Sequence, residues 1–556
     1  MKVSRRDLLL GSAGITAGFV FTPVPWKLLG DVSIWTQNWP WIPQPTHGPV
    51  ETKSSVCTLC AAGCGVRVRM ASACPVGISG VSTHPLTRGA LCPLGFAAHQ
   101  LNWHPQRLRE VRHRGRAASW AEAQAAFEKA CSEGPLAIVD ARPGRAASSI
   151  LETFAAKHNG SYRVVLSPES QALATYADWS GVPASALGYD LENARTIVSF
   201  GAPLLDGWGT PGRFTHLWSE RAAGAADPQL RLIQIEPSLS RTAARAWQWV
   251  PVRQGSEAAL AAGVARVLLE EHLVTAQGPT PPLSLSDGAA QTGLTTDAIR
   301  ILARTMVERR PTLVIAPDAN PAVAALNALL GAVATPGGIV LRNKSLAMQV
   351  PANPTAASPR ATLIDSTVPW EFIPQTGSEV FRFAAWDGGG AKADWLLPAP
   401  GFLEELMDVP TAPTSATNTY AVALNLSVPP EQVKSPAQFL ALLDSTMLDV
   451  EKIIHARCEE IFKSHLGTVF GEQAVPVAQF ESAAKMEDQL RKGAVWVGEP
   501  PRPGGFRCTL KEWPAETRVA PSTDWATAWI PPVLPPLAAK LYQESRLREH
   551  PARREA

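Results

Sequence analysis

Three closely spaced cysteines occur in the stretch Cys57-Thr58-Leu59-Cys60-Ala61-Ala62-Gly63-Cys64-Gly65, and a fourth follows in Cys92-Pro93-Leu94-Gly95. The spacing is C-x2-C-x3-C-x27-C, so one tight turn can direct three sulfurs toward a common centre that a more distant thiolate completes. The two glycines of the turn favour such a bend, because glycine adopts positive φ angles at little cost. Four thiolates are the usual ligands of a [4Fe-4S] cluster. We therefore predict that one [4Fe-4S] cluster is bound by Cys57, Cys60, Cys64 and Cys92.

Other uses of this motif fit less well. Soft thiolate ligands suit zinc as well as iron–sulfur clusters, but structural zinc sites usually contain two C-x2-C pairs and the second pair is missing here. A disulfide within the turn would leave one of three thiols over. Covalent haem attachment needs C-x-x-C-H, and Ala61 stands where the histidine would be.

The composition is that of a folded protein with several domains. The chain has 556 residues, of which 46% are hydrophobic and 18% charged, so two to four domains and a large core are expected. The net charge of +2 argues neither for nor against a nucleic-acid partner, but no basic stripe with interleaved aromatics is present, so no such partner is expected. Eight cysteines do not make a disulfide scaffold. We expect buried free thiols at Cys74, Cys131, Cys458 and Cys508, although a Cys458–Cys508 pair stays open.

Residues 1–30 have the features of a twin-arginine export signal. Ser4-Arg5-Arg6-Asp7-Leu8-Leu9-Leu10 carries the two arginines, and an uncharged run continues to Trp26. This predicts a location on the periplasmic side of the cytoplasmic membrane, and the lack of a clear A-x-A site leaves a retained N-terminal anchor open. Residues 31–50 form a Trp/Pro-rich arm, for which packing on the chain's own surface and docking on a neighbouring subunit remain alternatives.

Beyond residue 110, short apolar runs alternate with amphipathic segments. The predicted strands are 136–140, 163–166, 196–200, 231–236 and 312–316, and the predicted helices are 119–132, 148–157, 169–178, 213–223, 256–272, 296–309 and 322–332. This alternation predicts doubly wound α/β domains with parallel sheets, whose ligands bind at the carboxyl ends of the strands. The loops expected there are 201–209 and 236–242, with 336–338 and 393–394 as further candidates.

The predicted domains follow the chain in order. They are a 51–110 cluster module, a first Rossmann-like α/β domain from 111–145 and 311–450, a second from 146–310, and a 451–556 region with a helix and a Pro/Trp-rich tail. The helix is expected at 451–462, with Ile453, Ile454, Cys458 and Ile461 on one side. From Gly493 to Pro536 we expect a long irregular segment that binds a partner subunit.

Several further motifs carry a family resemblance. In chain order they are His84-Pro85, Ser119-Trp120, Ile197-Val198-Ser199-Phe200-Gly201, Ile235-Glu236-Pro237-Ser238, Val250-Pro251-Val252-Arg253-Gln254-Gly255-Ser256-Glu257, Leu326-Asn327-Ala328-Leu329-Leu330-Gly331 with Pro336-Gly337-Gly338, and Ala393-Asp394-Trp395-Leu396-Leu397-Pro398 with Glu404. With the cysteine motif, their order and spacing resemble the large subunits of the molybdopterin-guanine-dinucleotide (bis-MGD) oxidoreductases, from the cluster to about residue 445. The resemblance implies a bis-pterin molybdenum site beside one cluster.

The sequence departs from this family at several places, among them Glu236 and Trp247, each of which stands where the family commonly has an aspartate. Family enzymes usually ligate molybdenum through a residue in the loop before the 196–200 strand, but 167–193 contains no cysteine, which leaves Ser167, Ser170 and Asp178 as conceivable ligands. Leu94 stands where the family commonly has a lysine between cluster and pterin. The family's C-terminal β-barrel domain is expected to be absent. These departures argue against bound molybdopterin guanine dinucleotide and molybdenum, and we predict no catalytic residue.

Segments 199–208 and 541–548 look more like a molybdenum-free branch of the family, found in alternative complex III and the quinone reductase complex of sulfate reducers. This resemblance implies an electron-transfer subunit with ferredoxin-like iron–sulfur, multihaem cytochrome c and integral membrane quinone-binding subunits as partners. Two alternatives stay open: a non-redox assembly subunit, or an active molybdenum enzyme whose pterin pocket another chain completes. Arg67, Arg69 and Arg88 either raise the cluster's potential or are ordinary surface arginines.

Overall fold

The computed structural model describes residues 4–21, 50–71, 74–205, 207–223, 227–275, 278–343, 359–365, 378–386, 393–501 and 504–514. They belong to two units, one comprising residues 1–51 and 70–74 and the other residues 52–69 and 75–556. The Trp/Pro arm up to residue 49 and the last part of the tail, 515–556, lie outside the described residues.

The predicted export signal contains the helix α1 (Arg5–Phe21). Ser4 precedes the helix and caps it, because its Oγ accepts a hydrogen bond from the Asp7 amide at 3.1 Å. The leucines that follow, Leu8 to Leu10, are exposed. Across the described ranges, no helix combines the length and the apolar character that crossing a membrane requires.

The cluster module is built on a three-stranded sheet with the order β1-β2-β3. Its elements are β1 (Val50–Val56), β2 (Gly65–Ala71), β3 (Cys74–Gly80), α3 (Pro93–Ala97) and the 3-10 helix η1 (Ala98–Trp103). In β2 the buried Val66 and Val68 alternate with the exposed Arg67 and Arg69, as expected for a strand with one face on the core.

The first α/β domain contains a seven-stranded sheet with the order β5-β4-β16-β15-β14-β6-β7. The strands are β4 (Val111–His113), β5 (Arg116–Ala118), β6 (Leu136–Asp140), β7 (Ser161–Val164), β14 (Ala361–Asp365), β15 (Glu379–Ala384) and β16 (Trp395–Pro398). β16, β15, β14, β6 and β7 run parallel, and β4 and β5 add an antiparallel edge. Asp140 pairs in register with Asp365, so two carboxylates meet at the carboxyl ends of neighbouring strands.

Helices α4 (Trp120–Glu133), α5 (Ala146–Lys157) and α13 (Pro436–Leu443) accompany this sheet. α4 begins with the predicted capping box, in which Ser119 Oγ accepts from the Glu122 amide and the Glu122 carboxylate accepts from the Ser119 amide. Phe127 of α4 makes edge contacts with Phe381 of β15 and Phe439 of α13, which join helices and sheet in one aromatic core.

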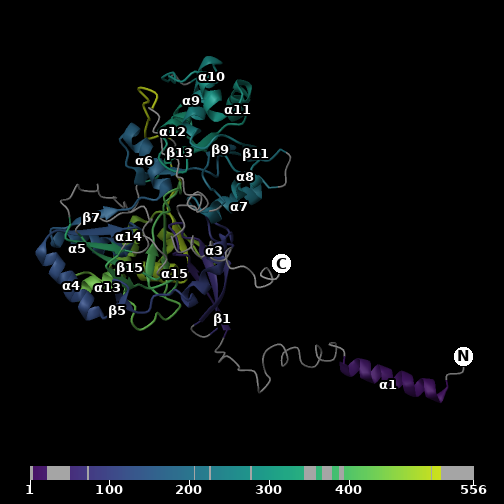
Figure 1. The fold of residues 1–556 in the computed structure, drawn as a ribbon, viewed down its shortest axis with the longest axis vertical. Helices are drawn as coiled ribbons and strands as arrows, with labels where there is room; N and C mark the ends of the chain where they lie inside the picture. Colours follow the sequence, from purple (N-terminus) through teal and green to yellow (C-terminus); the bar gives the residue numbers. More distant parts are fainter. Residues whose placement is uncertain are drawn as a thin grey trace. The chain divides into compact units, whose positions relative to one another are not determined.

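The second α/β domain contains a four-stranded parallel sheet with the order β11-β10-β9-β12. Its strands are β9 (Thr196–Phe200), β10 (Arg231–Ile235), β11 (Gln248–Val250) and β12 (Thr312–Ile315). Two further strands, β8 (Leu187–Tyr189) before β9 and β13 (Ile339–Leu341) after β12, form a separate antiparallel pair. The helices are α6 (Pro168–Ser180), α7 (Pro211–Arg221), α8 (Arg241–Arg245), α9 (Glu257–Glu270), α10 (Leu285–Thr292), α11 (Thr296–Glu308) and α12 (Pro321–Leu329), with the short η2 (Ala184–Ala186). Figure 1 shows α9, α10 and α11 grouped together, and both α10 and α11 contact α9. The residues of β9, β10 and β12 are all buried, as is typical of a parallel sheet covered on both faces.

An antiparallel sheet follows with the order β17-β18-β21-β19-β20. Its strands are β17 (Met407–Val409), β18 (Thr419–Ala423), β19 (Thr468–Phe470), β20 (Ala474–Pro476) and β21 (Val495–Val497), accompanied by α14 (Val450–Ser464), η3 (Val477–Gln479) and α15 (Ala483–Arg491). The predicted 451–462 helix is confirmed as α14, whose Ile454, Cys458 and Ile461 are buried in the core beneath the sheet.

The division between the two α/β domains differs from the sequence prediction. The sequence pattern assigns 146–310 to the second domain, but α5 packs on β6 and β7 pairs with β6, so both belong to the first. Conversely β12, predicted in the first domain, pairs with β9 of the second. Alternation of strands and helices shows the order of elements, whereas hydrogen bonds between distant segments decide which sheet each strand joins.

The segment from Gly493 onward is also more ordered than predicted. Val495–Val497 forms β21 at the centre of the antiparallel sheet. Further along, Phe506 and Trp513 are buried in two cores of the second α/β domain, so this part of the segment packs on its own chain. A three-residue strand between glycines has too little periodicity to be recognised in sequence.

Candidate functional site

The loop between β1 and β2 carries the first three cysteines. The Cys57 amide donates to the Cys64 carbonyl at 2.8 Å, which closes the loop on itself. Gly63 has a φ of +60°, and a Cβ on it would lie 2.8 Å from Val409 Cγ1. A Cβ on Gly65 would lie 2.6 Å from His84 Cδ2. Both glycines are therefore needed, one for its left-handed backbone and both for close packing.

The fourth cysteine, Cys92, occupies the N-cap position of α3, where its Sγ accepts a hydrogen bond from the Gly95 amide at 3.4 Å. Pro93 opens the helix with the φ angle that a first turn requires. The short α3 thus fixes the direction in which the Cys92 sulfur points.

All four predicted cysteines line one cavity. It is closed from the module by Leu59, Leu91, Leu94 and Gly95, and from the second α/β domain by Gly207 and Pro211. Cys57 and Cys64 are each 5% exposed. Leu94, at the position of the family's lysine, therefore forms part of an apolar wall that excludes water from the sulfurs.

The thiols could not all ionise in this cavity without a compensating charge. Burial, and next the charge of Cys92, raise the pKa of Cys57 to about 12. Burial followed by repulsion from the neighbouring thiolates raises the pKa values of Cys60 and Cys64 well above the ordinary thiol value. Iron ions supply positive charge that allows such thiolates to coexist, so the donor set fits a cluster.

Backbone N–H groups complete the surroundings of the sulfurs. The Gly95 amide donates to Cys92 Sγ at 3.4 Å. The backbone amides of Leu59, Ala62 and Gly212 favour the thiolates of Cys57, Cys60 and Cys64 and oppose the rise in their pKa values that burial causes. Within the part of the chain that the structure describes, no group of three or more His, Cys, Asp or Glu residues is arranged to hold a single metal ion. The sulfurs instead surround a cavity, as a multi-iron cluster requires.

The arginines near the motif in sequence face away from the cavity. Arg67 and Arg69 are on the exposed positions of β2, and Arg88 forms a surface ion pair with Glu220. Of the two interpretations that the sequence leaves open, the structure favours ordinary surface arginines.

One carboxyl group near the cavity was not identified from the sequence. Glu169, in the first turn of α6, is 1% exposed, and its Oε2 has no hydrogen-bond partner. Burial raises the pKa of Glu169 to about 7, and its charge contributes to the raised pKa of Cys60. A glutamate in a first helical turn is common on protein surfaces, so no sequence signal marked its burial.

Replacing Glu169 by glutamine is expected to change how stability depends on pH. The folded-state pKa of about 7 lies above the ordinary value of 4.5, so the wild-type protein loses stability as pH rises from 4.5 to 7. The loss amounts to roughly 3 kcal/mol for a shift of this size. In denaturant melts at pH 8 the Glu169→Gln variant should exceed wild type in stability, and near pH 4 the two should agree; equal stability at both pH values would contradict the assignment.

The phosphate-binding position of the first α/β domain is occupied by the chain itself. In dinucleotide-binding folds a phosphate sits at the N-terminus of the helix after the first strand. Here that helix is α5, and its Ala146 amide donates to Asp408 Oδ1 at 2.7 Å. Asp408 Oδ2 in turn accepts from Arg457 of α14 at 2.5 Å. A carboxylate of the antiparallel sheet thus takes the place of a phosphate.

A buried ion-pair network lies at the carboxyl ends of the same strands. Arg145 contacts Asp365 at 2.5 Å and Asp140 at 3.6 Å, and both carboxylates are almost fully buried. Tyr162 donates to the other oxygen of Asp140 at 2.7 Å. The charges at these strand ends are therefore paired with each other.

The loops predicted to bind a ligand in the second domain do come together, but they bind one another. In the 201–209 loop, Trp208 is 2% exposed and donates to the Pro317 carbonyl beyond β12 at 2.8 Å. The Leu205 amide donates to Thr242 at 3.3 Å, which joins this loop to the one after β10. Glu236 accepts from Gln234 and from the Ser240 amide.

The remaining candidates are distributed over different places. Ser167 and Ser170 hydrogen-bond to each other at 3.0 Å, and Asp178 is exposed on α6. Asp394 lies at the amino end of β16, where it accepts from the Val380 amide, so the 393–394 segment is not at the carboxyl ends of the strands as predicted. No strand is predicted at 395–398 from the sequence, and without that strand the sequence does not show that 393–394 lies at an amino end of the sheet.

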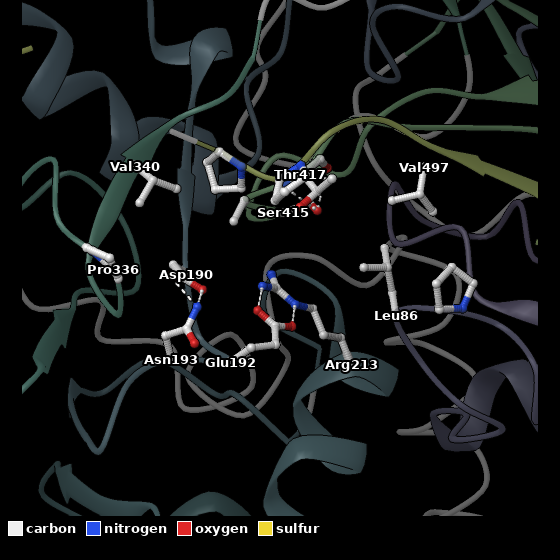
Figure 2. Close-up of a pocket in the computed structure, with 14 residues that line it drawn as sticks. Leu86, Asp190, Glu192, Asn193, Arg213, Pro336, Val340, Ser415, Thr417 and Val497 are labelled. Carbon is white, nitrogen blue, oxygen red and sulfur yellow. Dashed lines mark hydrogen bonds and ion pairs between the residues drawn. The ribbon is translucent and has the colours of Figure 1, made fainter. Parts of the chain in front are cut away.

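The loop 336–338 contributes to a second cavity, of about 340 Å³ (Figure 2). Figure 2 shows Glu192 and Arg213 facing each other, with Asn193 beside Asp190. Arg213 also donates to the Thr414 and Tyr189 carbonyls, and Asp190 accepts from the Gly337 amide. The charged groups in its wall are thus engaged with the wall itself.

All eight cysteines are free in this structure. Cys458 and Cys508 lie in different cores, so the open pairing is not formed. Cys458 is buried as expected, whereas Cys74 is exposed, which corrects that prediction. Cys74 lies on an edge strand of a small sheet, where little of the protein covers it.

Comparison with known proteins agrees with this geometry. Residues 50–102 match the molybdopterin oxidoreductase Fe4S4 domain. The chain is 30% identical over 484 residues to the menaquinone reductase molybdopterin-binding-like subunit of Nitratidesulfovibrio vulgaris, a match that covers 77% of this chain and 70% of that protein. The chain therefore belongs to the molybdopterin oxidoreductase family, as the resemblance predicted.

Two further similarities mark the extent of the relationship. The chain is 26% identical over 245 residues to a sulfite dehydrogenase subunit of Allochromatium vinosum, covering 41% of this chain and 24% of that one. Its fold is similar to acetylene hydratase from Pelobacter acetylenicus, with a TM-score of 0.57, 15% identity, and coverage of 81% and 74% of the two chains. The α/β architecture with parallel sheets and the Fe4S4 domain are thus those of the family.

Proposed function

We propose that this protein is the iron–sulfur electron-transfer subunit of a membrane-associated quinone oxidoreductase complex. The observation that carries the proposal is that Cys57, Cys60, Cys64 and Cys92 all line one cavity whose other walls are mostly apolar. Similarity to a menaquinone reductase subunit over most of the chain supports the class of complex.

The chain's own residues would perform three tasks for the cluster. The four thiolates hold it, the leucines around them shield it from water, and the Gly95 amide donates to the Cys92 sulfur. A [4Fe-4S] cluster, when bound, supplies one-electron transfer at a potential set by these surroundings.

We further propose that the α/β domains act mainly as a scaffold, without molybdenum or bis-MGD. Three features support this: Asp408 at the N-terminus of α5, the paired charges around Arg145, and the buried Trp208. A nucleotide phosphate at the N-terminus of α5 would have to displace Asp408 from the Ala146 amide.

The remaining parts of the proposal concern place and partners. The twin-arginine motif supports export to the periplasmic side of the cytoplasmic membrane. A one-electron carrier without its own substrate site needs neighbours. We propose that these are a multihaem cytochrome c, integral membrane quinone-binding subunits and a ferredoxin-like iron–sulfur subunit.

Elemental analysis of the purified complex or full chain tests the central claim. We expect about four iron atoms per chain, and molybdenum, tungsten and zinc each well below one. Acid hydrolysis should release no guanine nucleotide. Stoichiometric molybdenum together with guanine nucleotide would overturn the scaffold role while leaving the cluster in place.

That outcome would establish the second candidate, an active molybdenum oxidoreductase completed by another chain. The chain is 23% identical over 341 residues to the thiosulfate reductase molybdopterin-containing subunit PhsA of Salmonella typhimurium. This similarity supports the second candidate function. A third candidate, a non-redox assembly subunit, predicts no iron and no iron–sulfur EPR signal after dithionite reduction.

A further inference from the structure

The helix α7 directs its N-terminus at the cysteine cavity. α7 has 11 residues and follows β9, the strand from which the second α/β sheet is built outward. Pro211, its first residue, lines the cavity, and so does Gly207 in the preceding loop. Gly212 comes next and lies against Cys64, since a Cβ on it would be 3.1 Å from Cys64 Sγ, and its amide favours the Cys64 thiolate and so opposes the rise in that thiol's pKa. A βα unit that would serve a phosphate in a nucleotide-binding domain thus faces a cysteine sulfur.

Close approach explains why a glycine is found at this position. A Cβ on Gly212 would lie 2.7 Å from the Ala90 carbonyl oxygen and 3.1 Å from Cys64 Sγ. It would also lie 3.1 Å from Thr87 Cγ2. Any side chain would therefore push the first turn of α7 away from the sulfur.

The neighbouring residue holds this turn in place. Arg213 is 2% exposed, and its guanidinium is bonded to Glu192 and to the Thr414 and Tyr189 carbonyls. These contacts come from two segments of the chain, residues 189–192 and the segment containing Thr414, so the first turn of α7 is anchored from two sides. The Gly212 amide is consequently held in a fixed position beside Cys64.

We propose that the N-terminus of α7, through the Gly212 amide, raises the reduction potential of the cluster held by Cys64; this inference rests on the proposed function. The helix N-terminus carries partial positive charge, and a hydrogen bond to sulfur stabilises the more negative, reduced state. The second α/β domain then has a direct part in electron transfer. Gly212 is a positioning residue, because it acts through Cys64.

The test is a redox titration of the Gly212→Ala variant in the full chain, followed by EPR. Displacing a hydrogen bond to a charged group is expected to lower the equilibrium constant for reduction about tenfold, a shift of about 59 mV to more negative potential for one electron. Gly263→Ala on α9 is the matched control, since its added Cβ has only ordinary contacts, 3.5 Å from Ile299. Iron content is measured beforehand to establish whether each variant carries the cluster.

If Gly212→Ala loses its iron, a second pair of variants tests whether the N-terminus of α7 raises the reduction potential of the cluster. Thr210 is the N-cap residue of α7 and makes no capping hydrogen bond. Thr210→Asp adds a negative charge there, and Thr210→Asn has the same shape without it, so the Asp variant should have the more negative potential. Equal potentials in this pair, or an iron-loaded Gly212→Ala variant that titrates like wild type, would overturn the inference. Wild-type protein without iron would instead overturn the proposed function.

Discussion

Replacing Cys64 by serine in the full-length protein is expected to abolish its visible absorbance and its reduced-state EPR signal. Cys64 is 5% exposed, and it lies where the cysteine loop meets α7. A serine hydroxyl is a harder and less readily ionised ligand than a thiolate, so iron should fall from about four atoms per chain to below one. Loss of the cluster should also lower the melting temperature, because metal binding stabilises small metal-dependent modules.

The same module contains a matched control for this experiment. Cys74 is exposed and does not line the cavity. Cys74→Ser should therefore retain the absorbance, the iron content and the melting temperature of the wild type. Retention of full absorbance and unchanged potential by Cys64→Ser would remove the basis for the proposed ligand set.

Replacing Arg145 by methionine is expected to produce the largest loss of stability in the first α/β domain. Burial by itself would lower the pKa of Arg145. The negative charges of Asp365 and Asp140 outweigh this effect and raise the pKa above its ordinary value. Removing the guanidinium leaves two buried carboxylates without their partner, and breaking such a pair costs about 3–5 kcal/mol. Denaturant melts should show this as a lower midpoint with an unchanged slope.

Two comparisons show whether the loss comes from the unpaired charge. The double variant Arg145→Met with Asp365→Asn removes one orphaned carboxylate and should regain part of the stability. Lys463→Met breaks a surface pair with Glu459 and should cost less than about 1 kcal/mol. An Arg145→Met protein as stable as the surface variant would show that the network does not hold the strand ends together.

Much of the architecture could be predicted from local patterns. The strands at 136–140 and 196–200 are found at the predicted residues, and the capping box at Ser119 begins α4 as expected. Continuous apolar runs and capping signals depend on neighbouring residues, so they can be recognised without knowing the fold. β21 was missed because its place in the sheet depends on pairing with β18 and β19.

The candidate site was predictable in part for the same reason. The spacing of the cysteines indicated a shared centre, and the four thiols do line one cavity. The roles of Gly212 and Glu169 were not predictable, since both lie more than a hundred residues from the first cysteine of the motif. Neither belongs to a pattern that distinguishes it from an ordinary helix residue.

The amino-acid sequence alone determined the cysteine set, the α/β class and the family, because each depends on residue type and spacing along the chain. Only the tertiary structure decided that α7 points at Cys64, that Asp408 caps α5 and that Glu169 is buried. These features arise where separate domains pack against each other, and packing brings together groups whose distance along the chain carries no information about their contact.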